Sequence, residues 1–115
     1  MASDLARVAA LAADAKKAED VLALDLTDLS DVCDAIVVAT AANARLAESI
    51  LEEVEERLRS QFGLSPLSLE GREDVRWQLM DYGALVVHVF SPEGRDFYRI
   101  ERMWGDAPVI EVSLA

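Results

Sequence analysis

The sequence is poor in the residues that most often build metal and redox sites. Its 115 residues include one cysteine, Cys33, and one histidine, His88. A lone cysteine cannot close a disulfide within the chain, and one of each residue supplies too few ligands for zinc. We therefore expect a reducing, cytoplasmic environment and no bound metal or cofactor.

Long apolar runs are also missing from the chain. No uncharged stretch approaches the roughly 18 apolar residues that a membrane span needs. The alanine-rich N-terminal segment is interrupted by Arg7 and Asp14 before a signal-peptide core could form. We expect a protein that is neither secreted nor inserted in a membrane.

Basic residues are scarce relative to acidic ones. The chain has 11 Lys and Arg against 22 Asp and Glu, which gives a net charge of −11. Such a charge repels nucleic acid and attracts basic partners. The alternative interpretation is that the charge only keeps the protein soluble. Direct reading of DNA or RNA is therefore disfavoured.

What the chain does contain is enough apolar material for one core. Hydrophobic residues make up 52% of it and charged residues 29%, as in a globular protein. A chain of this length suits one domain. We predict a single domain over 1–108, followed by an extended or loosely ordered tail over 109–115.

The first half of the chain alternates between helical and strand-like patterns. Apolar residues at helical spacing predict a helix over 4–17, and Asn43 is a good N-cap for a second helix to about residue 61. Two apolar runs between them, 21–26 and 35–40, have strand length. Because 35–40 is apolar on both faces, we expect it inside the sheet.

The second half is expected to contain a short strand, a hairpin and a helix. Segment 66–70 predicts a strand ending at Glu70, and 76–90 predicts a hairpin. Ser91 as N-cap and Pro92 at the first helical position predict a helix over 92–104. The order α-β-β-α-β-β-β-α indicates an α/β or α+β fold with about five strands in a mixed sheet, parallel early and antiparallel late.

The hairpin turn is expected to be centred on Tyr82 and Gly83, which sets Trp77 opposite His88. Asp81 and His88 would then lie too far apart to act as a catalytic pair. A histidine opposite a tryptophan on an apolar face is most often a hydrogen-bonded core residue. One face of the hairpin is predicted to carry Trp77, Leu79, Asp81, Val86, His88 and Phe90.

The final helix is expected to bury one side and expose another. Its apolar side is predicted to hold Phe97, Ile100, Met103 and Trp104. Tyr98, Glu101 and Arg102 leave that stripe and are expected at the surface. Aromatic rings beside carboxylates would suit a partner bearing lysine or arginine.

An enzyme is the main alternative to a recognition protein. A metal-dependent nucleotidyl or phosphoryl transferase would need carboxylates that converge on divalent ions, and Asp25, Asp28 and Asp81 are the candidates. No glycine-rich phosphate loop or serine nucleophile elbow accompanies them. A dimeric adaptor for another protein is a third reading.

Two blocks of the sequence resemble a known family. The run WQLMDYGALVVHVFSPEGRDFYRIERMWGDAP closely resembles the signature of the ribosomal silencing factor family, also called Iojap-like or RsfS. The block VLALDLTDLSDVCDAIVVATAANARLAESILEEVEERL is similar to the N-terminal half of that family. The chain departs from the family pattern at Ala35, Ile36, Ala41, Ala42, Asp74, Val75 and Arg76.

The resemblance implies a translation repressor with a nucleotidyltransferase-like fold that lacks the transferase activity. Family members bind ribosomal protein fourteen of the large ribosomal subunit, where the small subunit would dock, and several form homodimers. The expected partner-binding residues follow from this resemblance and from the predicted faces of the hairpin and the last helix. They are Trp77, Asp81, His88, Tyr98, Glu101 and Trp104, with Glu70 and Arg95 as secondary candidates. The aromatic members would supply buried area and the carboxylates charge complementarity.

Overall fold

The computed structural model describes residues 2–71 and 76–114, which build one mixed sheet. Its five strands lie in the order β1-β2-β5-β4-β3. Their bounds are Glu19–Asp25 for β1, Ala35–Thr40 for β2, Ser68–Glu70 for β3, Trp77–Asp81 for β4 and Leu85–Phe90 for β5. The α+β architecture with a mixed five-stranded sheet is thus confirmed. The family departures at Asp74 and Val75 lie outside the described residues.

The parallel part of the sheet is not where we expected it. β1 and β2 pair antiparallel, and the parallel pair joins β2 to β5. Residues 26–34 between β1 and β2 contain no helix, and parallel neighbours need a long crossover that such a loop does not provide. The crossover instead runs from β2 through the second helix and the strands β3 and β4 before it reaches β5.

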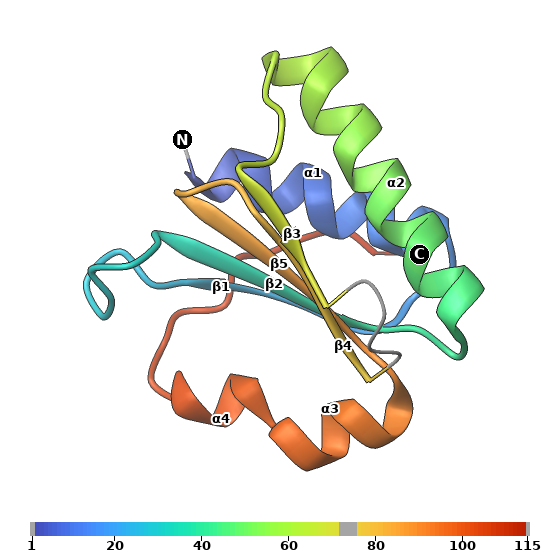
Figure 1. Ribbon diagram of the computed structural model, residues 1–115. Coiled ribbons are helices and arrows are strands. Elements are labelled where there is room, and N and C mark those ends of the chain that lie inside the picture. The colour runs from blue at the N-terminus through green and yellow to red at the C-terminus, as the bar shows by residue number, and fades with distance from the viewer. Residues whose placement is uncertain (1, 72–75, 115) are drawn as a thin grey trace.

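Helices cover both faces of the sheet (Figure 1). α1, Ala2–Ala15, and α2, Ala44–Phe62, lie on one face, and α3, Pro92–Tyr98, and α4, Ile100–Met103, lie on the other. The predicted cap of α2 is confirmed, because Asn43 Oδ1 accepts a hydrogen bond of 2.8 Å from the Leu46 amide. The strand β2 is buried along its whole length, as expected for a strand inside the sheet.

The hairpin register differs from the predicted one by two residues. Leu79 pairs with His88, and Trp77 pairs with Phe90 rather than with His88. The turn is centred one residue later than expected, with Gly83 at a φ of 85° in its first central position, which suits glycine. A shift of two residues leaves every side chain on its predicted face, so the predicted set of six residues on one face is retained.

The last helix is broken, contrary to expectation. Arg99 has φ 48° and ψ 46°, ends α3 and begins α4. An uninterrupted helix would have turned Phe97, Ile100, Met103 and Trp104 inward together. The left-handed residue instead turns Tyr98 towards the core beside Ile100 and Trp104, and leaves Phe97 and Met103 exposed.

The C-terminal segment contributes to the core. Ile110 is buried, and its amide donates a 2.8 Å hydrogen bond to the Ala23 carbonyl of β1. Val109 forms an isolated antiparallel bridge with Leu24. The segment is extended, which is one of the two predicted alternatives, and its contacts with β1 argue against the other, a loosely ordered tail. Among the helices of the described chain, none is long and apolar enough to cross a membrane.

Candidate partner-binding surface

The two faces of the sheet hold different side chains. On the α1–α2 face, the core is almost entirely aliphatic. The other face, which we call the aromatic face, is the one that α3 and α4 cover, and all five strands place side chains on it. It contains the aromatic cluster, defined as Trp77, His88, Phe90 and Tyr98.

The rings of the aromatic cluster are in mutual contact. The Trp77 ring centroid lies 4.7 Å from that of Tyr98 and 5.4 Å from that of Phe90. Such tilted and stacked pairs stabilise a fold beyond the area that they bury. Phe90 is fully buried, whereas Trp77 and Tyr98 keep part of their surface exposed. Tyr98 is therefore less exposed than the helical pattern predicted.

His88 is a buried, hydrogen-bonded part of this cluster. Trp77 Nε1 donates a 3.0 Å hydrogen bond to His88 Nδ1, which leaves the proton of the neutral ring on Nε2. Burial lowers the pKa of His88 to about 4, against a smaller opposing effect of the Asp81 charge. The ring is thus neutral at pH 7, and the core role expected for it is confirmed.

Asp81 and Glu70 lie on the same aromatic face, towards the β3 edge. Asp81 is paired with Ser68 of β3 and Glu70 with Leu79 of β4, so the two carboxylates project from adjacent strands. Asp81 Oδ1 accepts a 2.7 Å hydrogen bond from the Gly83 amide, which also fixes the turn. Glu70 is exposed and Asp81 is half-buried, so both remain within reach of a partner.

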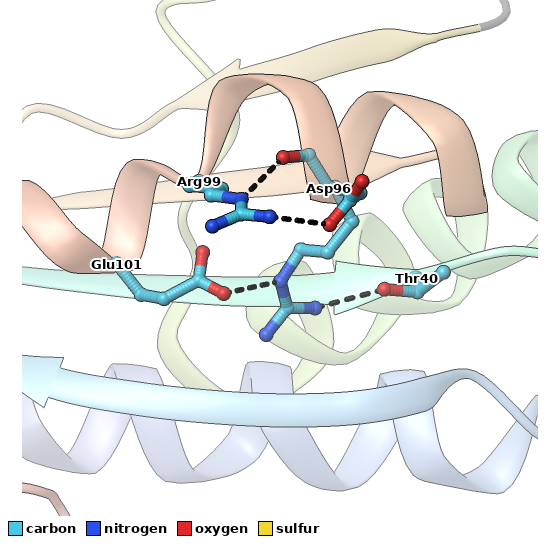
Figure 2. Close-up of polar contacts among 5 residues, drawn as sticks. Thr40, Asp96, Arg99 and Glu101 are labelled. Carbon is cyan, nitrogen blue, oxygen red and sulfur yellow. Dashed lines mark hydrogen bonds and ion pairs between the residues drawn. The ribbon is translucent and has the colours of Figure 1, made fainter.

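Glu101 and Arg95 do not lie beside Asp81 and Glu70. They belong to a polar network between α3–α4 and β2, in which Figure 2 labels Glu101 and Thr40 and draws Arg95 between them without a label. Arg95 Nε donates a 2.9 Å hydrogen bond to Glu101 Oε2, and its second guanidinium nitrogen donates one of 2.8 Å to Thr40 Oγ1. The side chains of Arg95 and Glu101 are only 13% and 28% exposed, so their charges neutralise each other inside the molecule. Glu101 is therefore less exposed than predicted, and its charge is paired within the chain.

The network also fixes the protonation state of Glu101. Burial alone would raise the pKa of Glu101, but the hydrogen bond and charge of Arg95, with a contribution from Arg102, lower it below its ordinary value. Glu101 Oε1 is buried and has no hydrogen-bond partner within the described chain. Thr40 anchors Arg95, and no signal in the sequence pointed to that role.

A polar groove of about 390 Å³ lies beside this network. Four carboxylates and three guanidinium groups line it, and Arg99 is paired with Asp96 across 3.0 Å. Such balanced charges do not select an ion of either sign. The groove is not lined by the aromatic cluster, but two of the predicted partner-binding residues, Arg95 and Glu101, line it.

The aspartates suggested for a metal-dependent transferase do not meet. Asp25 ends β1 and Asp81 ends β4, with β2 and β5 between them, which separates them by about 14 Å at the usual strand spacing. They also project from opposite faces of the sheet. Asp25 shares the face of Ala23, which packs in the α1–α2 core. Asp81 shares the face of Trp77, which packs on the aromatic face. Asp25 instead accepts hydrogen bonds from the amide and hydroxyl of Thr27. Within the described residues, no group of three or more His, Cys, Asp and Glu is placed to hold a metal.

Comparison with known proteins decides the family. The model of the family "RsfS: Ribosomal silencing factor during starvation" matches residues 1–115. The chain belongs to the RsfS family. It is 36% identical over 106 residues to the ribosomal silencing factor RsfS of Bacillus subtilis, an alignment that covers 92% of this chain and 89% of that protein. It is 37% identical over 109 residues to the RsfS of Halalkalibacterium halodurans, covering 95% and 92% of the two chains.

The fold is shared with a solved structure as well. A crystal structure of a Chromobacterium violaceum protein matches with a TM-score of 0.85 and 31% identity, and covers 100% of this chain and 96% of that one. The resemblance drawn from the hairpin and final-helix block is therefore confirmed. Membership of the RsfS family places this chain among ribosomal silencing factors.

Proposed function

We propose that this chain binds the large ribosomal subunit through ribosomal protein fourteen and sterically blocks the small subunit from joining it. The observation that carries the proposal is the family match over the whole chain. The bound protein would act by occupying space, so no catalytic residue, metal or cofactor is invoked. The site of action would be the cytoplasm, where the ribosomes are.

The charge of the chain supports a basic partner. Its net charge is −11, and a protein seated on ribosomal RNA needs lysine and arginine to neutralise phosphates. Opposite charges raise the association rate and suppress wrong partners. Glu70 and Asp81 on the aromatic face would supply the local carboxylates.

The aromatic face supports a docking surface at its border with α3–α4. Trp77, Tyr98 and Trp104 each combine a packed part with an exposed part. Half-exposed aromatic rings on a fixed framework are typical anchors of protein interfaces, since little side-chain entropy is lost when they are covered. The buried ring of His88 would hold Trp77 in position, and the pair of Arg95 and Glu101 would hold α3–α4 on the sheet.

The test uses Glu70→Lys, because Glu70 is exposed and its change does not disturb the core. We expect the free energy of binding to purified large subunits, measured by co-sedimentation, to weaken by more than about 1 kcal/mol, since a local attraction becomes a repulsion. Glu48→Lys makes the same change of net charge on α2, which covers the opposite face of the sheet, and is the matched control. Equal weakening by both variants would show that only the overall charge matters.

The self-association of the chain is measured in the same preparation. Homodimer formation, proposed from the family resemblance, would appear in light scattering as a doubled mass that falls when large subunits compete. Failure of the parent chain to co-sediment with large subunits would overturn the proposed function. A stable dimer without ribosome binding would favour the dimeric adaptor instead.

A further inference from the structure

The outer side of α3–α4 carries two large apolar side chains that the fold leaves uncovered. Phe97 is 76% exposed and Met103 is 72% exposed. Exposed apolar residues are common singly, and two large ones on consecutive short helices offer apolar area that a partner could cover. We call Phe97 and Met103 together the patch. Neither residue was expected at the surface, and neither contributes to the core beneath α3–α4.

The exposure follows from the backbone at Arg99. Its left-handed conformation costs a non-glycine residue on the order of 1–2 kcal/mol. Local bonds hold it there: the Arg99 amide donates to the Arg95 carbonyl, and its side chain donates to the carbonyl and carboxylate of Asp96. The chain thus keeps a strained residue whose effect is to turn Phe97 and Met103 outward.

The patch continues the aromatic cluster towards solvent. The Phe97 ring meets the Tyr98 ring edge-to-face, with centroids 5.0 Å apart, and the Tyr98 ring in turn contacts Trp77. A partner that covers the exposed part of Tyr98 would therefore reach Phe97 with the same surface. Interfaces concentrate their binding energy in such contiguous anchors.

Charge selects between the two main kinds of occupant. A second copy of this chain carries the same charge of −11 and would be repelled at close range, whereas a basic protein would be attracted. Glu93, one turn before Phe97, and Asp106, three residues after Met103, are exposed, and so are the basic Arg99 and Arg102. Arg99 is paired with Asp96, so the preference for a basic protein surface comes from the net charge of the chain.

We infer that Phe97 and Met103 are the apolar anchors by which this chain docks on the basic ribosomal protein of the large subunit. The inference rests on the proposed function and adds to it two residues outside the set that the family resemblance implied. The area of the two side chains is a part of the roughly 800 Å² per partner that a specific interface buries. The aromatic face would supply the remainder.

The test replaces each anchor by glutamine, which keeps helix propensity and removes the apolar surface. We expect Phe97→Gln and Met103→Gln each to weaken large-subunit binding at least about tenfold, as loss of an anchor does, with the melting temperature unchanged. Val32→Gln and Leu29→Gln are the controls, because Val32 is 85% exposed and Leu29 is 45% exposed in the loop between β1 and β2. Their binding should equal that of the parent.

The outcomes separate this inference from the proposed function. A parent chain that does not bind large subunits overturns both. A parent that binds, with Phe97→Gln and Met103→Gln binding equally well, overturns the inference and leaves the proposed function standing. Light scattering adds a further outcome: if the two variants abolish self-association and leave subunit binding intact, the occupant is a second copy and the inference is wrong.

Discussion

The two faces of the sheet solve different physical problems. On the α1–α2 face, alanines of α1 with no exposed area meet aliphatic side chains of α2 and of the strands. The aromatic face combines ring contacts with a buried histidine, an internal ion pair and a strained residue. Several of its side chains remain half-exposed. The comparison teaches that one face holds the fold together while the other keeps surface available for a partner.

The largest effect should come from the aliphatic face. Ile50 of α2 has no exposed area, and its truncation to alanine leaves a cavity in the densest part of the core. We expect Ile50→Ala to lower the free energy of unfolding by about 3–4 kcal/mol, measured by urea denaturation. Leu11→Ala removes a similar side chain that is 39% exposed and should cost less than about 1 kcal/mol. Similar losses of unfolding free energy in the two variants would contradict the claim that the buried aliphatic core holds the fold together.

An effect of the next size should appear on the aromatic face when the pH is lowered. The folded state lowers the pKa of His88 to about 4 from 6.5, so the unfolded chain binds more protons between these values. The stability due to the neutral ring is complete above pH 6.5 and is lost as the pH falls towards 4, by about 3 kcal/mol.

The control for this pH dependence is His88→Gln, which has no group that titrates at this position. The free energy of unfolding of the parent should fall relative to that of the variant between pH 6.5 and 4. Subtraction of the two curves removes the contributions of the many carboxylates. Parallel curves would show that His88 is not held neutral by the fold.

A smaller effect is expected at the break between α3 and α4. Arg99→Val places a β-branched residue in the left-handed region and should lower the free energy of unfolding by about 1–2 kcal/mol. Arg99→Gly should not lower it, because glycine adopts a φ of 48° without strain. The paired measurement by thermal unfolding isolates the backbone, since both variants lose the exposed ion pair with Asp96. Equal stabilities would argue against the left-handed conformation.

Local signals in the sequence predicted the parts of the fold that depend on local chemistry. Asn43 and Ser91 cap helices where the sequence placed their starts, and the apolar run of β2 is buried as expected. The hairpin register was off by two residues because such a shift preserves both faces, and the apolar pattern cannot distinguish the two arrangements. The parallel pairing of β2 with β5 joins strands that are far apart in the chain, which local patterns do not encode. The antiparallel pairing of β1 with β2 agrees with the short loop between them, a signal that the prediction did not use.

The candidate surface could be predicted only in part. Trp77, His88 and Tyr98 do come together, as the hairpin face and the family resemblance suggested. The pairing of Glu101 with Arg95, and the exposure of Phe97 and Met103, depend on the break at Arg99. Arginine carries no signal for a left-handed conformation, so the helical period was extended through it. One backbone residue thereby turned Phe97 and Met103 outward and Tyr98 inward, while Ile100 and Trp104 kept their predicted inward side.

The most direct test of the central claim is a subunit-joining measurement. Purified large and small subunits are mixed with increasing amounts of the chain, and sucrose-gradient sedimentation gives the fraction of joined ribosomes. We expect joined ribosomes to fall as the chain accumulates on free large subunits, and Glu70→Lys to require a higher concentration than Glu48→Lys. A constant fraction of joined ribosomes with large subunits saturated by the chain would contradict the steric block.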